Sequence, residues 1–277
     1  MKQFTVAFLG TGSMGSAILN GMIQSGTKGS DVRATTKTVA NSEQLAIKYG
    51  VSAFATEQHP NANSLAVQGA DIVIVAVKPG YVLEVLDEIS SVIARDALVI
   101  SVAAGVQIKT MEEHLPDTVS VIRAMPNTPA LIQKGVTGIS TGSRVSAAQL
   151  EIATELFEAV GKALVIPEDH IDALSTISGS GPAYVFYLME EFIKTAVSQG
   201  FSQEAAYLMV SETFLGASEL LVQTQGDPAE LRRQVTSPNG TTMRAIAVMQ
   251  DANLHDLFLK ATSAALARAK EIAQEQK

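Results

Sequence analysis

Short apolar runs alternate with longer stretches of helical periodicity over the N-terminal part of the chain. Runs of this length and composition predict β-strands at residues 5–9, 32–35, 72–77, 98–102, 119–125, 136–140 and 163–166. The run at 72–77 shows no polar alternation, which indicates a central parallel strand covered by helices on both faces. Gly50 and Gly161 are expected to stop helices between strands. This alternation predicts an α/β fold, with a Rossmann-type doubly wound sheet over residues 1–166.

The pattern changes after Pro167, where strand-like runs disappear and Ala, Leu, Met, Glu and Gln dominate. This composition favours helices and predicts an all-α domain over residues 167–277. Pro182 suits the first turn of a helix that runs to Gln199 and stops at Gly200, and a second helix begins at Ser202. Apolar residues on the second helix spread beyond one stripe, so we expect another copy of the chain to cover it.

Composition and charge exclude several classes of function. The absence of cysteine removes disulfide scaffolds, thiolate metal sites and cysteine nucleophiles. A net charge of −8 argues against binding to nucleic acid or to an anionic membrane. Residues 3–27 carry no charge, but glycines interrupt them, which argues against a membrane or signal segment. We therefore expect a soluble, cytoplasmic protein, and the scattered histidines predict no metal site.

A glycine-rich turn follows the first predicted strand and opens an apolar helix. It has the form G-x-G-x-x-G and comprises Gly10, Thr11, Gly12, Ser13, Met14 and Gly15. Gly10 permits the tight turn, Gly12 lets a pyrophosphate approach the backbone, and Gly15 lets the helix lie close to the strand. A glycine-rich turn without a ligand is the alternative. The position of the motif at the start of a βαβ unit favours a dinucleotide site.

The residues after the second predicted strand bear on which dinucleotide is bound. An NAD site usually offers Asp or Glu about 20 residues after the glycines, whereas this chain has Thr35, Thr36 and Lys37. Hydroxyl groups and a lysine can receive a 2′-phosphate, so we predict a preference for NADPH, with NADH used less efficiently. The alternative is an ordinary basic surface loop.

Two further loops follow predicted strands on the presumed ligand side of the sheet. One contains Ala76, Val77, Lys78 and Pro79, and the other contains Val102, Ala103 and Ala104. Their small residues allow a nicotinamide ring to lie against the backbone. Lys78 either faces phosphate or ribose oxygens or is an ordinary surface lysine. A third loop, residues 125–129, is stiffened by two prolines and is either a pocket wall or a rigid connection.

Two polar turns, residues 178–184 and 235–244, interrupt the helical half, and each feeds a helix. Exposed backbone N–H groups at a helix start favour a carboxylate. Capped turns of purely structural importance are the alternative.

With these turns included, the sequence resembles the pyrroline-5-carboxylate reductase family over essentially its whole length. The discriminating segments are SGSGPAY at 178–184 and VTSPNGTT at 235–242. Asn239 stands where relatives often have glycine, and asparagine tolerates the left-handed conformation. The other matching segments are FLGTGSMG at 8–15, AVKP at 76–79, SVAAG at 101–105 and RAMPNTP at 123–129.

This resemblance implies reduction of 1-pyrroline-5-carboxylate to L-proline by NADPH, the final step of proline biosynthesis. It implies that Gly240 and Thr241 bind the substrate carboxylate through backbone N–H groups and that the Thr241 hydroxyl faces the ring nitrogen. We expect Ser178, Ser237 and Thr242 to complete the substrate site. Asn63, with residues 76–79 and 102–104, would line the cofactor site. Related enzymes form dimers with interleaved C-terminal helices, and often decamers.

A cyclic imine has a basic nitrogen that can arrive already protonated, so the enzyme needs mainly to bind the carboxylate, orient the ring and deliver hydride. Our hypothesis is that Thr241 hydrogen-bonds the nitrogen and acts as donor or proton relay. One alternative is a β-hydroxyacid or phosphogluconate-type dehydrogenase, with Lys194 as the candidate general base. The other is a non-catalytic nucleotide-binding protein.

Overall fold

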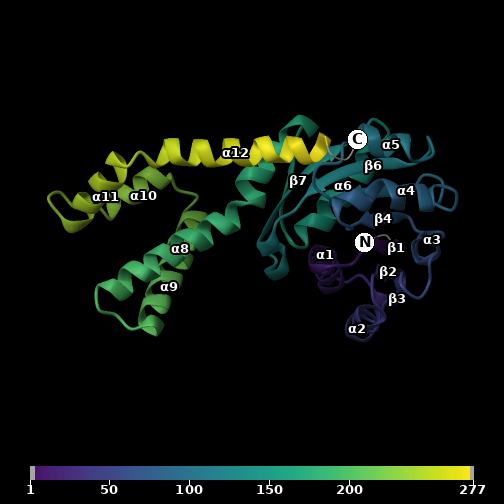
Figure 1. Cartoon of the computed structure of the whole chain (residues 1–277), viewed down its shortest axis with the longest axis horizontal. Coiled ribbons are helices and arrows are strands. Elements are labelled where there is room, and N and C mark those ends of the chain that lie inside the picture. The colour runs from purple at the N-terminus through teal and green to yellow at the C-terminus, as the bar shows by residue number, and fades with distance from the viewer. Residues whose placement is uncertain (1–3, 275–277) are drawn as a thin grey trace. The chain divides into compact units, whose positions relative to one another are not determined.

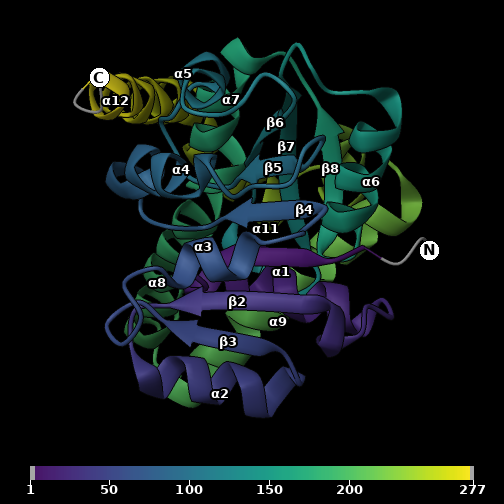
Figure 2. The same ribbon diagram turned by 90° about the vertical axis from the view of Figure 1, so that its right-hand side faces the viewer.

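The first part of the chain forms an eight-stranded sheet (Figures 1 and 2). The structure, a computed structural model, describes residues 4–274, and the side chains of residues 4–271. The strand order is β3-β2-β1-β4-β5-β6-β7-β8, and every neighbouring pair is parallel except the antiparallel pair of β6 and β7. The strands are β1 (Val6–Leu9), β2 (Val32–Thr36), β3 (Ser52–Ala55), β4 (Ile72–Val75), β5 (Leu98–Ser101), β6 (Ser120–Met125), β7 (Gly135–Thr141) and β8 (Gly161–Val165).

The predicted doubly wound sheet is confirmed, with one strand missed and strand ends that differ from the prediction by one or two residues. The sequence did not reveal β3, an edge strand whose first three residues are exposed or half-buried, so that its apolar pattern is weak. The strand predicted over residues 72–77 ends at Val75, although the Ala76 N–H still donates to the Leu9 carbonyl of β1.

Helices cover both faces of the sheet because successive strand residues point to opposite sides. Val6, Phe8, Ile72 and Ile74 pack in one core beneath α1 (Ser13–Gln24), α2 (Val39–Tyr49) and α6 (Ala147–Glu158). Ala7, Leu9, Val73 and Val75 pack in the other beneath α3 (Ala62–Val67), α4 (Val82–Ser90) and α5 (Ile108–Glu113).

The two glycines expected to stop helices behave differently. Gly50 ends α2 in the left-handed conformation, with φ of 67°. Gly161 is not a helix stop, and that prediction was wrong: α6 ends at Glu158, and Gly161 is the first residue of β8. A Cβ at Gly161 would lie 2.0 Å from the carbonyl oxygen of Gly135, so this glycine is required by close strand pairing.

A short irregular helical segment follows β8 and is tied to the sheet by a buried arginine. The segment comprises α7 (Ile171–Leu174) and a π-helical turn, Ser175–Gly179. Arg123, on β6, has a side chain that is only 4% exposed, and it pairs with Asp172 at 2.6 Å and with Glu168 at 3.5 Å. Glu168 also accepts a hydrogen bond from the Ile108 N–H at 2.7 Å. These contacts fix the segment against the carboxyl end of β6.

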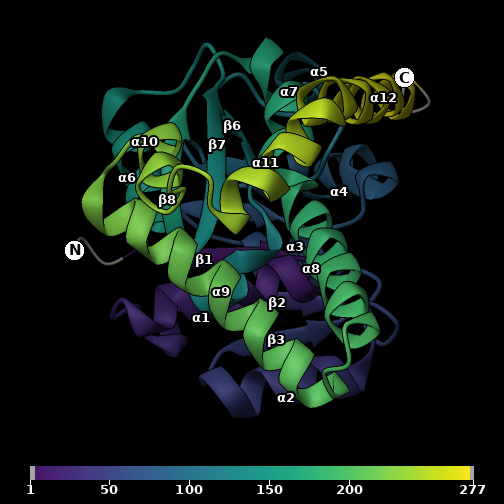
Figure 3. The same cartoon turned by 90° about the vertical axis from the view of Figure 1, so that its left-hand side faces the viewer.

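The remaining chain is helical (Figure 3). Ser202 caps α9, as predicted, by accepting a hydrogen bond from the Ala205 N–H, and Pro182 is the second residue of α8. The helices α8 and α9 contact each other and diverge from the turn that joins them (Figure 3). The helices are α8 (Gly181–Ser198), α9 (Gln203–Thr224), α10 (Pro228–Gln234), α11 (Thr241–Asp251) and α12 (Leu254–Gln274).

The chain divides into two compact units, whose described residues are 4–180 with 265–274, and 181–264. Helix α12 contributes residues to both. The domain boundary predicted after residue 166 stays a prediction. Residues 167–180 are helical, as that boundary assumed, but they belong to the same compact unit as the sheet, to which Arg123 links them through Asp172.

The second unit exposes many large apolar side chains. In α9, Leu208 is 61% exposed and Val222 is 74% exposed, and only Ala206 and Val210 of this helix are buried. Within the described residues, α9 is the one helix long and apolar enough to cross a membrane by length and composition. Apolar area of this kind needs a partner surface.

The Arg123 ion pairs predict a measurable share of stability. Arg123→Met should lower the free energy of unfolding by about 2 kcal/mol, because it leaves two partly buried carboxylates without their cation. Arg233→Met is the matched control: Arg233 pairs with Glu230 on α10, and the two side chains are 63% and 48% exposed, so its loss should cost under about 1 kcal/mol. Urea midpoints at one protein concentration measure both, and equal losses would contradict the assignment.

Candidate active site

Four loops meet at the carboxyl edge of the parallel strands. The N–H of Ala76 donates to the carbonyl of Leu9 at 2.8 Å, that of Val102 to Val75 at 3.0 Å, and that of Thr11 to Thr35 at 2.7 Å. The loops after β1, β2, β4 and β5 are therefore neighbours. They carry the residues expected to bind cofactor, namely Gly10–Gly15, Thr35–Lys37, Ala76–Pro79 and Val102–Ala104.

The glycine turn is shaped by its neighbours. Gly10 has φ of +76°, and a Cβ there would lie 2.4 Å from Cγ1 of Val77. A Cβ at Gly15 would approach Cβ of Ala76 to 3.2 Å. Gly12 caps α1 without a side-chain hydrogen bond, and a Cβ there would meet only the Gly10 carbonyl oxygen, at 4.0 Å. The first N–H groups of α1, at Ser13 and Met14, have no acceptor within the helix and are available to an anion.

One orphaned polar atom supports a ligand at this turn. The hydroxyl oxygen of Thr11 is buried, yet it has no hydrogen-bond partner among the described residues. A buried hydroxyl is normally satisfied. Together with the space at Gly12, it fits a dinucleotide whose phosphate and ribose oxygens lie against the turn.

The three residues expected to receive a 2′-phosphate are placed differently from one another. The Thr35 side chain is 1% exposed, and its hydroxyl accepts from the Gly10 N–H at 2.9 Å and donates to Oδ1 of Asn63 at 2.8 Å. The Thr36 hydroxyl is buried and donates to the Thr38 carbonyl at 2.9 Å. Lys37 is exposed. Thr35 therefore organises the turn, and Lys37 is the accessible cation at the end of β2.

The other expected cofactor residues line the same edge. Asn63, on α3, is 8% exposed and lies between Thr35 and Glu88. Lys78 and Ala104 are exposed, and Ala103 is buried.

The loop after β6 connects the sheet to the helical segment. Asn127 is 7% exposed, donates to the Ser178 carbonyl at 2.9 Å and accepts from the Val136 N–H at 2.8 Å. Ser178 donates its hydroxyl to the Leu174 carbonyl at 3.2 Å. These contacts make residues 125–129 a rigid connection that holds the Ser178 turn. The sequence did not identify Arg123 or Asn127 as anchors, although an arginine within an apolar strand was a signal.

The second expected anion site lies within the helical unit, at the turn before α11. Asn239 adopts the left-handed conformation, with φ of 59°, and the Gly240 N–H donates to the Ser237 carbonyl at 3.1 Å. A Cβ at Gly240 would lie 2.5 Å from the Ser237 hydroxyl and 3.1 Å from the Ser237 carbonyl oxygen, so a larger residue would displace the Ser237 side chain. Gly240 caps α11 without a side-chain hydrogen bond. Thr241 is exposed, and the N–H groups of Thr241 and Thr242 open the helix.

Lys194 does not have the environment of a general base. Its ammonium donates to Glu190 at 2.7 Å and to Glu191 at 2.8 Å, and these hydrogen bonds raise the pKa of Lys194 above its ordinary value. A general base must be unprotonated near working pH, which requires the opposite shift.

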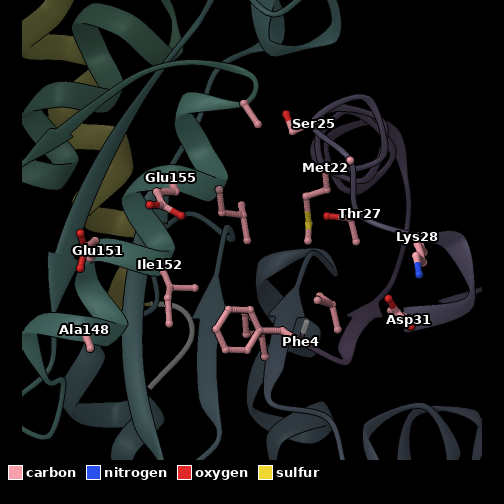
Figure 4. Close-up of a pocket in the computed structure, with 15 residues that line it drawn as sticks. Phe4, Met22, Ser25, Thr27, Lys28, Asp31, Ala148, Glu151, Ile152 and Glu155 are labelled. Atoms are coloured by element: carbon pink, nitrogen blue, oxygen red, sulfur yellow. The ribbon is translucent and has the colours of Figure 1, made fainter. Parts of the chain in front are cut away.

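A separate cavity lies at the opposite edge of the sheet (Figure 4). Its volume is about 820 Å³, and it is lined by Val6 and Ile72 at the amino ends of β1 and β4, together with Met22, Ile152 and Glu155. Parallel sheets bind ligands beyond the carboxyl ends of their strands. None of the residues expected to bind cofactor or substrate lines this cavity.

Two family descriptions match the chain. Residues 168–272 match "Pyrroline-5-carboxylate reductase dimerisation", and residues 5–105 match "NADP oxidoreductase coenzyme F420-dependent". The pyrroline-5-carboxylate reductase of Pseudomonas aeruginosa is 35% identical over 99% of both chains.

Solved structures agree with these matches. A pyrroline-5-carboxylate reductase from Coxiella burnetii superposes with a TM-score of 0.91 at 35% identity, covering 98% of this chain and 99% of that one. A Plasmodium falciparum pyrroline carboxylate reductase with NADP bound superposes with a TM-score of 0.85 at 25% identity, covering 99% of each chain.

The exposure of Lys37 predicts a role in cofactor preference. Lys37→Gln should lower kcat/KM for NADPH about tenfold, through loss of a charged contact of about 1.5 kcal/mol, and leave NADH nearly unchanged. Lys48→Gln removes the same charge from the far end of α2 and should change neither. Steady-state kinetics with both cofactors measure the ratio. A parallel fall for both cofactors would reject the 2′-phosphate contact.

Proposed function

The chain belongs to the pyrroline-5-carboxylate reductase family, and we propose that it completes proline biosynthesis by reducing 1-pyrroline-5-carboxylate to L-proline with NADPH. The observation that carries a residue-level account is the turn before α11. Asn239 in the left-handed conformation leads into Gly240, which caps an 11-residue helix without a side-chain hydrogen bond, so the first N–H groups of that helix are open to an anion.

The substrate carboxylate is the natural anion for this turn. Backbone N–H groups at a helix start, reinforced by the helix dipole, bind a carboxylate without an arginine. The Thr241 N–H would contact it directly, with Ser237 and Thr242 beside it, whereas the Gly240 N–H would have to exchange its hydrogen bond to the Ser237 carbonyl for one to the carboxylate. Ser178, whose turn is held by Asn127 in the first unit, is a further proposed substrate residue.

Bound NADPH supplies the hydride for the imine carbon. The C=N bond becomes a C–N single bond as that carbon gains a hydrogen and an electron pair, and the cofactor leaves as NADP⁺. If the nitrogen enters protonated, as its basicity favours, it leaves the step as a neutral amine. If it enters neutral, a proton must reach it as the electron pair of the C=N bond arrives.

The chain's own contribution is then orientation and one hydrogen bond. A Thr241 hydroxyl on the ring nitrogen would fix the ring and act as donor or proton relay to a neutral imine. No strong acid is needed, since a basic nitrogen is protonated far more readily than a carbonyl oxygen.

The cofactor contacts follow the carboxyl edge of the sheet. The pyrophosphate would lie on the turn formed by Gly10, Thr11, Gly12, Ser13, Met14 and Gly15. Lys37 would receive the 2′-phosphate, with Thr35 and Thr36 shaping the loop behind it. Ala76, Val77, Lys78, Pro79, Val102, Ala103 and Ala104 would line the nicotinamide half, with Asn63 supporting the edge. NADH would serve less well because it lacks the phosphate.

The exposed apolar residues of the helical unit support assembly with a second copy, in keeping with the match to a dimerisation family over residues 168–272. We propose a dimer with interleaved C-terminal helices, which can assemble further into decamers, in the cytoplasm. A dimer also gives α9 a partner surface that requires no bilayer.

The dehydrogenase alternative is disfavoured by Lys194. Its two carboxylate partners stabilise the protonated form, whereas oxidation of a hydroxyacid needs a base. A non-catalytic nucleotide-binding protein is disfavoured because relatives that match nearly the whole chain at 34% and 35% identity are named as reductases.

The role of Thr241 predicts a loss of turnover. Thr241→Ala should lower kcat by roughly 10- to 100-fold, from a hydrogen-bond contribution of about 1–3 kcal/mol. NADPH oxidation with 1-pyrroline-5-carboxylate, followed by absorbance, measures it. Thr241→Ser retains the hydroxyl and should retain most activity. Wild-type turnover by the alanine variant would refute the role of Thr241. A wild-type protein that oxidises hydroxyacids with NADP⁺ and does not reduce 1-pyrroline-5-carboxylate would refute the proposed reaction.

The second-copy proposal predicts that charge on α9 dissociates the assembly. Leu208→Glu with Leu215→Glu should shift the light-scattering mass to a smaller species, because each buried leucine contributes roughly 1.5–3 kcal/mol. Ile47→Glu is the control: Ile47 is 87% exposed on α2 of the first unit and should not affect the mass. A wild-type protein that is monomeric at micromolar concentration would contradict the proposal.

A further inference from the structure

A series of hydrogen bonds runs from helix α4 to the glycine turn. Glu88 lies on α4, Asn63 on α3, and Thr35 at the end of β2. The Asn63 amide donates to Oε2 of Glu88 at 2.7 Å, and the Thr35 hydroxyl donates to Oδ1 of Asn63 at 2.8 Å. The Gly10 N–H donates to that same hydroxyl at 2.9 Å. We propose that Glu88, which touches no cofactor residue except Asn63, is a positioning residue for the cofactor turn.

The carboxylate fixes the direction of every bond in this series. An ionised carboxylate only accepts, whereas an asparagine side chain has one donating and one accepting end. Glu88 therefore selects the Asn63 orientation whose NH₂ faces α4 and whose oxygen faces Thr35. The Thr35 hydroxyl must then donate to Asn63, which leaves its lone pair to accept from Gly10.

Because Thr35 and Asn63 are buried, the wrong orientation of the Asn63 amide would be costly. Thr35 is 1% and Asn63 is 8% exposed, so water has little access to replace a lost partner. Glu88 is itself held in place, because its Oε1 accepts from the Ser64 N–H at 3.3 Å and its carbonyl accepts from the Ser64 hydroxyl at 3.2 Å. A reversed or broken link would leave a buried donor facing a donor.

The consequence is a preformed glycine turn. Gly10 and Thr11 direct their N–H groups to the hydroxyl and carbonyl of Thr35, which fixes how the chain enters α1. The N–H groups of Ser13 and Met14 are thereby oriented before the ligand arrives. This inference rests on the proposed contact between the turn and the cofactor pyrophosphate.

If only charge mattered, removing the Glu88 carboxylate would strengthen NADPH binding, which is the opposite of what a positioning role predicts. Removing a carboxylate from a protein of net charge −8 should favour an anionic dinucleotide. A positioning role predicts that Glu88→Gln weakens NADPH binding, since the glutamine NH₂ must face either the Asn63 NH₂ or the Ser64 N–H.

The experiment is a double-mutant cycle on the full-length protein, with the NADPH dissociation constant measured by fluorescence for wild type, Glu88→Gln, Asn63→Asp and the double variant. Asn63→Asp alone places two carboxylates in contact. In the double variant, the amide of the introduced glutamine can donate to the introduced aspartate and accept from the Ser64 N–H, while that aspartate still accepts from the Thr35 hydroxyl. The double variant therefore again has one donor and one acceptor at every hydrogen bond between Thr35 and residue 88. Any direct effect of the aspartate charge on NADPH is common to both proteins that carry Asn63→Asp.

We expect Glu88→Gln to weaken binding about tenfold in the wild-type background and to strengthen it in the Asn63→Asp background. At saturating NADPH, kcat should stay within about twofold of wild type while KM for NADPH rises. An equal effect of Glu88→Gln in both backgrounds, or unchanged binding by the single variant, would overturn the inference. A role in stability alone would not reverse sign with the identity of residue 63.

Two controls test why NADPH binding weakens in Glu88→Gln. Asp87→Asn makes the same change one residue earlier on α4, where Asp87 is exposed and pairs with His114 at 2.6 Å, so NADPH binding should be unchanged. An equal weakening by this variant would overturn the specific role of Glu88. Gly12→Val fills the proposed pyrophosphate space and should abolish binding whatever Glu88 does. Normal binding by Gly12→Val would reject the cofactor placement itself.

Discussion

The cofactor edge depends on the pairing of β1 with strands on both sides. All four residues of β1 are buried, and they align in parallel with β2 from Val6 to Phe8 and with β4 from Val6 to Leu9. Parallel pairing makes the three carboxyl ends coincide, and β2 and β4 lie on opposite sides of β1. The loops that must share a ligand are therefore brought together by backbone hydrogen bonds. The positive φ of Gly10 and the small size of Gly15 are consequences of this crowding, since Val77 and Ala76 occupy the space where side chains would lie.

Much of this edge could be predicted from the sequence, because local patterns specified it. An apolar run followed by G-x-G-x-x-G identifies a strand, a turn and a helix without any long-range information. The edge strand β3 was missed because its residues are only half-buried and its pattern is weak. The same limit applies to Thr35, which was expected to face the ligand. A threonine at the end of a strand looks the same in sequence whether its hydroxyl points outward or, as here, into a buried hydrogen-bond chain.

Long-range polar contacts were beyond the reach of pattern analysis. The partners of Asn63 are 28 and 25 residues away along the chain, and Arg123 reaches Asp172 across 49 residues. Such pairs leave no periodic trace, since each partner resembles an ordinary surface residue in its own segment. The turn before α11 is the reverse case, because its glycine, asparagine and hydroxyl residues are adjacent in sequence. Local chemistry therefore indicated an anion site there, while the proteins it resembles indicated which anion.

The two proposed anion sites explain how a protein of net charge −8 can bind two negatively charged ligands. Each uses the first N–H groups of a helix whose capping residue is a glycine without a side-chain hydrogen bond, Gly12 for α1 and Gly240 for α11. A side chain at either cap would compete for those N–H groups, as Ser202 does at α9 by accepting from Ala205. A helix that binds no ligand can have a side-chain cap of this kind. At α1 and α11 a side-chain cap would occupy the N–H groups that the proposed ligands need. Selectivity then comes from shape and from few cations, because a backbone N–H attracts an anion only at close range and leaves the overall surface acidic.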